Sequence, residues 1–197
     1  MQDVVLDRVC KAYGDKAVLR SFCAVFPAGQ LSCVMGPSGA GKTTLLRLLM
    51  GLEAPDSGTI TGLEGARLSA VFQEDRLCGY LSPIGNLRLV APALSDAAAV
   101  GLLRAFALRG CEQQPCRELS GGMLRRVALL RALTADYDAL LLDEPFKGLD
   151  RETKALVMRE TRSRCAGRTV ILVTHEADEA EAMGAAQLVR TETFLAC

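Results

Sequence analysis

A glycine-rich stretch early in the chain has the residues of a phosphate-binding loop. It reads Gly36-Pro37-Ser38-Gly39-Ala40-Gly41-Lys42-Thr43-Thr44 and fits the pattern Gly-x-x-x-x-Gly-Lys-Thr in full. Glycines at these positions let backbone N–H groups turn toward phosphate oxygens, and the helix that follows directs its positive end at the same charge. Lys42 is placed to reach the β- and γ-phosphates of a nucleotide, and the Thr43 hydroxyl to ligate Mg²⁺.

Two adjacent carboxylates end an apolar run in the second half of the chain. Asp143 and Glu144 directly follow Ala-Leu-Leu-Leu at 139–142. A buried strand of this kind places both residues at the carboxyl edge of a parallel sheet, beside the phosphate loop. There Asp143 can hold Mg²⁺ directly or through water, and Glu144 can polarise an attacking water as a general base. The plain alternative, a strand that ends in solvated acids, is disfavoured by the phosphate loop.

The single histidine of the chain follows another β-branched run. His175 comes directly after Val-Ile-Leu-Val-Thr at 170–174. A polar residue at a strand tip, downstream of a phosphate loop, is suited to sensing a γ-phosphate. A lone histidine is more often a surface or core residue, so this role depends on the neighbouring motifs.

The segment Leu119–Met123, Leu-Ser-Gly-Gly-Met, precedes a helix that carries Arg125 and Arg126. A hydroxyl and two glycines at a helix start can form a second anion site, and an ordinary helix cap is the alternative. Two anion sites with one set of carboxylates favour a second site that closes over nucleotide bound to another copy.

Alternating and apolar runs predict the elements that must position these residues. The expected strands are Val4–Val9, Val18–Phe26, Leu31–Met35, Thr59–Thr61, Ala66–Phe72, Ala139–Leu142, Thr169–Val173 and a last short one, with Asp56–Gly58 as a turn. The expected helices are Thr43–Met50 ended by Gly51, Asp96–Leu108 capped by Ser95, Gly121–Leu133, Arg151–Arg164 and Ala177–Met183. Strands that alternate with helices indicate an α/β fold with a parallel sheet covered on both faces. Residues 77–117 are expected to form a small helical insertion.

Composition limits the classes that remain. The chain has 197 residues, 50% of them hydrophobic, and 23 basic and 23 acidic residues, so one substantial domain is expected and no nucleic-acid partner. Its apolar stretches fall short of the ~20 residues that a spanning helix needs. The N-terminus lacks the pattern of a secretory signal.

The eight cysteines include no Cys-x-x-Cys pair and are expected to be buried thiols in a reducing compartment.

In their order along the chain, these motifs resemble the nucleotide-binding subunits of ATP-binding-cassette (ABC) transporters over nearly the whole length. The phosphate loop resembles Walker A, Leu140–Glu144 resembles Walker B with its catalytic glutamate, and Gly148–Asp150 resembles the D-loop. Leu119–Met123 resembles the family signature, with Met123 where glutamine is commonest. The resemblance implies a P-loop NTPase (RecA-like) core with a small antiparallel β-subdomain and an inserted α-helical subdomain. It divides the single domain 1–197 into core plus β-subdomain at 1–76 and 119–197, and a helical subdomain at about 77–118.

The resemblance also implies a role for each site residue. Gln73 falls at the Q-loop glutamine, Tyr13 where an aromatic residue stacks on adenine, and His175 at the switch histidine that holds the γ-phosphate. The implied catalytic residues are Glu144, His175 and Gln73, and the implied Mg²⁺ ligands are Thr43, Gln73 and Asp143. ATP would be bound by Tyr13, Gly36, Pro37, Ser38, Gly39, Ala40, Gly41, Lys42, Thr43 and Thr44, and contacted in trans by Ser120, Gly121, Gly122 and Asp150.

The implied assembly is a head-to-tail dimer with a second copy or a homologous subunit, with two ATP molecules sandwiched between them. ATP binding closes the dimer, hydrolysis opens it, and the cycle drives an integral membrane permease docked on the helical lobe, with Leu77–Leu87 as the expected contact. An extracytoplasmic solute-binding protein is the further partner expected. The subunit would be cytoplasmic and peripheral on the inner face of the cell membrane.

Two short segments of the chain resemble those of importer ATPases of the nitrate, sulfonate and taurine group. The likeness lies in Asp143–Phe146 and in Phe72–Leu77. The chain departs from that group at Lys147-Gly148, where Ser-Ala is common, and at Gly79-Tyr80, where Pro-Trp is usual. These departures affect the D-loop and the expected permease contact, and the substrate cannot be predicted from the sequence.

Three alternatives remain open. The chain could serve an exporter, or it could be a soluble ABC ATPase of repair or translation, although those usually carry paired cassettes or long insertions. A small-molecule kinase or a GTPase is the third. A GTPase needs an Asn-Lys-x-Asp base reader, and the single asparagine of the chain, Asn86, precedes leucine.

Overall fold

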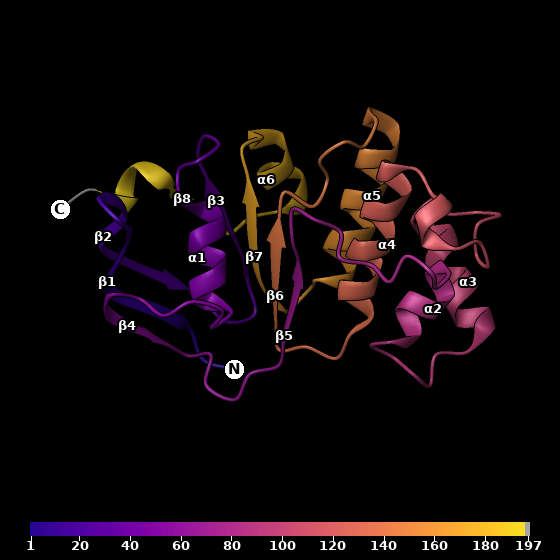
Figure 1. Ribbon diagram of the computed structural model, residues 1–197, viewed down its shortest axis with the longest axis horizontal. Helices are drawn as coiled ribbons and strands as arrows, with labels where there is room; N and C mark the ends of the chain where they lie inside the picture. Colours follow the sequence, from indigo (N-terminus) through magenta and orange to yellow (C-terminus); the bar gives the residue numbers. More distant parts are fainter. Residues whose placement is uncertain (196–197) are drawn as a thin grey trace.

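An open parallel sheet forms the centre of the molecule. In the computed structural model, which describes residues 1–195, five strands lie in the order β5-β6-β7-β3-β8 (Figure 1). They are β3 (Leu31–Met35), β5 (Leu68–Val71), β6 (Ala139–Asp143), β7 (Thr169–Thr174) and β8 (Gln187–Arg190). Every neighbouring pair is parallel, so the carboxyl ends of all five strands lie along one edge. The predicted α/β class and parallel sheet are confirmed.

Helices and strands cover both faces of this sheet, which explains why the central strands β6 and β7 are buried along their whole length. Every residue of β6 and β7 is buried, as in parallel sheets with two covered faces. Leu140 and Leu142 pack with α4 (Gly121–Thr134), α5 (Arg151–Arg164) and α6 (Ala177–Met183). Leu141 and Ile171, on the opposite face, pack with α1 (Lys42–Leu49).

A smaller antiparallel sheet completes the core on the α1 side. Its strands β1 (Val4–Tyr13), β2 (Lys16–Phe26) and β4 (Ser57–Thr61) lie in the order β2-β1-β4, at the left of Figure 1. Leu6, Phe22 and Phe26 join the same apolar cluster as the α1 leucines. Phe22 also stacks edge-on with Phe194, with ring centroids 4.7 Å apart, in the short 3-10 helix η2 (Thr191–Phe194). The expected antiparallel β-subdomain is present.

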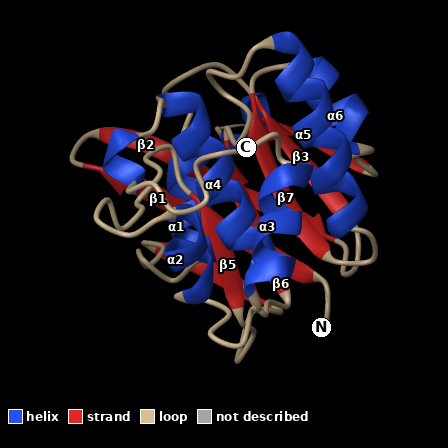
Figure 2. Cartoon of the chain, turned by 90° about the vertical axis from the view of Figure 1, so that its right-hand side faces the viewer, coloured by secondary structure: helices blue, strands red, loops and turns tan. Residues whose placement is uncertain are grey.

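The insertion between β5 and α4 is helical. It contains α2 (Pro83–Arg88), α3 (Asp96–Ala105) and the 3-10 helix η1 (Cys116–Glu118). The insertion lies at the end of the molecule opposite the small sheet in Figure 1, and this end faces the viewer in Figure 2. Ser82 and Ser95 cap α2 and α3 by accepting hydrogen bonds from Gly85 N at 3.2 Å and Ala98 N at 3.3 Å. Within residues 1–195, no helix is both long enough and apolar enough to cross a bilayer.

Two local predictions are wrong. Asp56–Gly58 is not a turn, because Ser57 and Gly58 begin β4. Asp56 accepts a hydrogen bond from Ala12 N at 2.7 Å and draws the segment onto β1, while Gly58 packs so closely that a Cβ would lie 2.3 Å from Arg8 O. The helix predicted to reach Leu108 ends at Ala105, because Ala107 has a left-handed φ of 54° and Leu108 N turns back to donate to Leu103 O at 2.9 Å.

The thiols are more varied than expected. Cys33, Cys111, Cys116 and Cys165 are buried, and burial raises the pKa of Cys33 to about 12. Cys23 and Cys78 are exposed and Cys10 is half-buried, so the prediction of buried thiols is wrong for these three. Cys197 lies outside the described residues.

Candidate active site

The phosphate loop joins the end of β3 to the start of α1, and close packing on two sides restricts its residues. Gly41 precedes α1 with a φ of 92°, and a Cβ there would lie 2.4 Å from Val18. Gly36 has a second constraint, because its Cβ would lie 1.8 Å from Thr191 Oγ1. The two glycines therefore let the loop pack closely between β2 and η2, and Gly41 alone also has a left-handed backbone that other residues rarely adopt.

The first turn of α1 carries the residues suited to phosphate and metal. The Lys42 ammonium is buried and donates to the carbonyls of Gly36 and Pro37 at 2.6 and 2.8 Å. The Thr43 hydroxyl donates to Asp143 Oδ2 at 2.9 Å. Burial raises the pKa of Asp143 and that hydrogen bond opposes the rise. Asp143 Oδ1 is buried with no hydrogen-bond partner among residues 1–195, so a hydroxyl and an unpaired carboxylate oxygen offer the hard ligands that Mg²⁺ takes.

Glu144 leaves β6 in a strained conformation. Its φ is 47°, in the left-handed region, and its N–H donates to Val173 O of the neighbouring strand at 2.9 Å. The side chain is 5% exposed, with Lys147 Nζ 3.1 Å from one carboxylate oxygen and His175 Nδ1 3.3 Å from the other. Burial acts to raise the pKa of Glu144, but Lys147 and His175 outweigh it, and the pKa lies below its ordinary value.

His175 lies at the end of β7 on a firmly anchored turn. Thr174 before it donates from its hydroxyl to Glu179 of α6 at 2.5 Å. Lys154 of α5 lies 2.6 Å from Glu179 and 2.5 Å from Glu176. The flanking residues are therefore fixed while the imidazole is 47% exposed, which leaves it free to contact a ligand.

A cavity of about 400 Å³ joins the phosphate loop and Glu144 to the β1–β2 hairpin. Asp143 and His175 do not line it, but they contact Thr43 and Glu144, which do. Its walls bring together residues from the phosphate loop, the hairpin and the tips of β5 and β6: Tyr13, Lys16, Val18, Ser38, Gly39, Gly41, Lys42, Thr43, Thr44, Gln73, Glu144 and Lys147. Tyr13 is hydrogen-bonded through its hydroxyl to Glu53, which orients its exposed ring at the mouth. Lys16 and Val18 are site residues that sequence reasoning missed, because the turn into β2 has no motif of its own.

The Leu119–Met123 segment lies apart from this cavity. Ser120 caps α4 by accepting from Met123 N at 3.4 Å. Gly121 and Gly122 line a second cavity of about 490 Å³, which shares only Gln73 and Lys147 with the first. Asp150 caps α5 by accepting from Thr153 N at 3.0 Å, and that bond lowers its pKa. Within one chain, Ser120 and Asp150 are therefore not brought to the phosphate loop.

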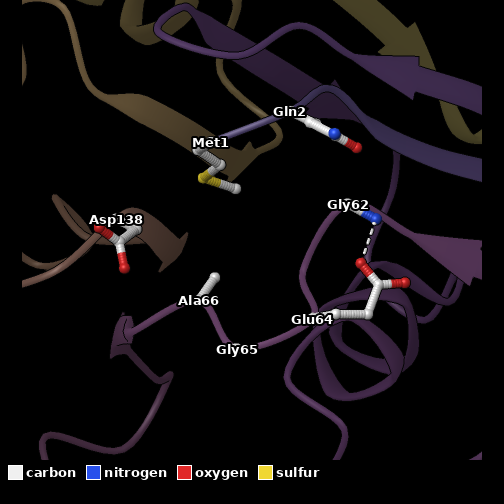
Figure 3. A pocket seen from close by; sticks show the side chains of 7 residues that line it. All are labelled: Met1, Gln2, Gly62, Glu64, Gly65, Ala66 and Asp138. Carbon is white, nitrogen blue, oxygen red and sulfur yellow. Dashed lines mark hydrogen bonds between the residues drawn. The ribbon is translucent and has the colours of Figure 1, made fainter.

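A larger cavity of about 520 Å³ lies away from this chemistry. It is lined by Met1, Gln2, Gly62, Glu64, Gly65, Ala66 and Asp138 (Figure 3). Asp138 directly precedes β6, so this cavity lies at the amino edge of the sheet, opposite the strand tips. Figure 3 shows the Glu64 carboxylate turned back onto Gly62 N, its partner at 2.8 Å. The volume of a cavity alone therefore does not identify the active site.

Comparison with known proteins agrees with this geometry. A profile of the family described as "ABC transporter" matches residues 20–147. The Nod factor export ATP-binding protein I of Paraburkholderia xenovorans (strain LB400) is 37% identical over 195 residues, which cover 90% of this chain and 64% of that protein. The aliphatic sulfonates import ATP-binding protein SsuB 1 of Rhodococcus jostii (strain RHA1) is 39% identical over 187 residues, covering 91% and 76%. The chain thus spans about two thirds of the length of such relatives.

A solved structure extends the likeness to three dimensions. The dimeric structure of MJ0796, a bacterial ABC transporter cassette, superposes with a TM-score of 0.82 at 25% identity. The match covers 95% of this chain and 94% of that one, so both sheets and the helical insertion have counterparts in a single cassette.

Proposed function

Because the chain belongs to the ABC transporter family, we propose that it hydrolyses ATP and that this reaction powers transport through a separate membrane permease. The observation that carries the proposal is the position of Glu144, whose carboxylate lies 3.3 Å from His175 at the edge where the phosphate loop begins. A carboxylate, a histidine and a phosphate loop at one sheet edge suit attack by water on a terminal phosphate.

Five side chains at this edge of the sheet have a part in the proposed reaction. Glu144 accepts the proton of the attacking water, and its lowered pKa keeps it in the ionised form that can do so. Lys42 exchanges its carbonyl partners for the β- and γ-phosphates, and His175 contacts the γ-phosphate from the β7 side. Gln73 orients the water from the end of β5, and the Tyr13 ring stacks on adenine.

Thr43 and Asp143 would hold Mg²⁺, with Gln73 as a further ligand. When bound, the ion neutralises charge on the β- and γ-phosphates during transfer. The hydrogen bond between Thr43 and Asp143 already places their oxygens together, which supports this assignment.

The active unit is a head-to-tail dimer in which each ATP contacts Ser120, Gly121, Gly122 and Asp150 of the opposite subunit. Support comes from the separation of these residues from the phosphate-loop cavity of their own chain. The Ser120 turn opens α4, so its N–H groups and helix dipole are suited to a γ-phosphate presented by a partner.

The permease docks on the helical insertion, and Leu77–Leu87 supplies the contact. Tyr80 is 80% exposed, and Leu89 and Val90 are exposed nearby, so this end of the molecule presents apolar groups. The subunit lies on the cytoplasmic face of the membrane through this contact. We favour an importer that works with an extracytoplasmic solute-binding protein, since several similar proteins are sulfonate import subunits.

An exporter is the second candidate, because Nod factor export proteins are about as similar. Phosphate release from MgATP by the purified chain, with Lys42→Ala as the inactive comparison, tests the ATPase. Purification of the tagged chain from membranes tests its partners. A permease with a solute-binding protein supports the importer, and a permease with none supports the exporter. Recovery of an active chain from membranes with no membrane protein bound to it contradicts both.

A further inference from the structure

One buried charge has no place in the reaction as described. Arg125 lies on α4, about one turn beyond the cap Ser120, and its side chain is only 6% exposed. A buried guanidinium is costly unless its N–H groups are bonded. Its contacts therefore indicate what the charge does.

One nitrogen of the guanidinium, Nη1, binds the loop that follows β5. It donates to Phe72 O, to Gln73 O at 3.4 Å and to Asp75 Oδ1 at 3.2 Å. Arg125 thus ties α4 to two backbone carbonyls and one carboxylate of this loop. The same loop contains Gln73, which is proposed to orient the water.

The other nitrogen, Nη2, binds the tip of β6. It donates to Asp143 O at 2.6 Å and to Glu144 O at 2.7 Å. Glu144 has the left-handed backbone noted above; its N–H donates to Val173 O, and its carbonyl also accepts from Lys147 N at 3.2 Å. A strained residue keeps its conformation only when its surroundings fix it, and Arg125 fixes it from the α4 side.

We propose that Arg125 is a positioning residue for the general base: its rigid fork joins the Gln73 loop to the Glu144 peptide, so a displacement of one displaces the other. The inference rests on the proposed function, in which Glu144 accepts a proton and the Gln73 loop adjoins the permease contact. The planar guanidinium suits this task because its two terminal nitrogens are fixed relative to each other. Movement of the insertion against the permease would thereby set the catalytic position of Glu144.

The neighbouring arginine has a different task. Arg126 donates to Gly122 O at 3.1 Å, Phe106 O at 3.0 Å and Ala107 O at 2.7 Å, which ties α4 to the insertion. Arg126 thus contacts the backbone just after Ser120 through Gly122, whereas none of the Arg125 bonds described above reaches that turn. Arg131, near the other end of α4, is the matched control for losing an arginine from this helix.

The test compares steady-state MgATP hydrolysis by wild type, Arg125→Met, Arg125→Lys and Arg131→Met in the same assembly. A small displacement of a catalytic group lowers turnover strongly, so Arg125→Met should lose about 10- to 100-fold in kcat with KM for MgATP within about twofold. Arg125→Lys should recover thermal stability but not kcat, because one ammonium cannot span both loops. Arg131→Met should keep the wild-type kcat.

A second readout uses Glu144→Gln, which retains shape but cannot accept the proton. If Arg125 acts through Glu144, adding Arg125→Met should still permit the ATP-dependent dimer seen by size-exclusion chromatography. A wild-type kcat in Arg125→Met, full recovery of kcat by Arg125→Lys, or loss of that dimer in the double variant would overturn the inference.

The proposed function and the inference fail in different ways. No MgATP hydrolysis by the wild type contradicts the function, whereas hydrolysis that Arg125→Met leaves intact contradicts the inference alone. If Arg125→Met does not fold, Asp75→Asn decides, since it removes the ion pair on the loop side and keeps the Glu144 side. It should lower kcat in the same direction and leave KM unchanged; an unchanged kcat would refute the link.

Discussion

The Thr43 hydroxyl donates a hydrogen bond to Asp143 Oδ2 at 2.9 Å although the two residues are 100 positions apart. It joins α1 to the tip of β6 at the two residues proposed to hold Mg²⁺. Thr43→Val keeps the side-chain volume and removes the oxygen, so ATP affinity measured with Mg²⁺ should fall to the level measured with EDTA. Thr43→Ser should behave as wild type. Wild-type Mg²⁺ dependence in Thr43→Val would contradict the assignment.

Glu144→Gln should leave ATP binding intact and abolish steady hydrolysis, because an amide cannot accept the proton of the attacking water. The ATP-bound dimer should accumulate. Nucleotide binding by fluorescence, phosphate release and size-exclusion chromatography measure the three effects. Normal turnover in this variant would rule out Glu144 as the general base.

His175→Ala should likewise collapse hydrolysis with little loss of nucleotide affinity, since the exposed imidazole is proposed to contact the γ-phosphate. An isolated subunit can hydrolyse weakly without its permease, so variant and wild type are compared in the same assembly. ADP affinity should be unchanged. Full activity of the variant would return His175 to an ordinary surface role.

Gly41→Ala should weaken ATP binding and destabilise the fold by about 1–3 kcal/mol, as expected for a non-glycine residue forced into a left-handed backbone. The Val18 contact, 2.4 Å from the added Cβ, adds to this cost. Gly14→Ala is the matched comparison, with a φ of 56° in the β1–β2 turn and nothing within 4 Å of its Cβ. Chemical unfolding and ATP titration of both variants separate loop strain from steric contact; equal losses would exclude the Val18 effect.

Stability should depend on pH through Asp138. Its carboxylate accepts from Arg67 N, Nε and Nη2 at 2.8, 3.1 and 2.9 Å, and these bonds hold the pKa of Asp138 well below its usual range. A lowered pKa adds stability above the unfolded value of about 3.9, and that stability is lost as the pH falls below it.

Asp138→Asn should therefore lower Tm at neutral pH, and its difference from wild type should shrink below about pH 4. Thermal unfolding across this range measures the effect. Asp15→Asn, in the exposed β1–β2 turn, is the control and should differ little from wild type at any pH. A constant difference for Asp138→Asn would show that the charge of Asp138 is not the cause.

The strand tips that form the site can be predicted from sequence because buried parallel strands are continuous apolar runs. β3, β6 and β7 each stop where the polar chemistry begins, so their ends follow from residue type to within one residue, whereas their order in the sheet does not. The start of β4 at Ser57-Gly58 could not be predicted, since it depends on the hydrogen bond from Ala12 N of β1 to the Asp56 carboxylate rather than on a strand pattern of its own. The sequence does signal the N-terminus of α2, because the cap residue Ser82 is followed by Pro83 in the first turn.

The direction of Arg125 could not be predicted. Arg125 and Arg126 are adjacent, and neighbours on a helix point about 100° apart. α4 is packed against the sheet, α5 and the insertion, so apolar residues surround it and give no single face from which to orient the arginines. Their separate partners emerge only from the tertiary structure.

The single histidine of the chain also makes the site unusually easy to observe. One imidazole implies one set of imidazole resonances in a nuclear magnetic resonance spectrum, and it comes from a ring 3.3 Å from the Glu144 carboxylate. ATP, ADP or a second subunit that alters that contact should shift the signal without any introduced label. A polyhistidine tag would obscure it, so samples for such spectra need a different handle.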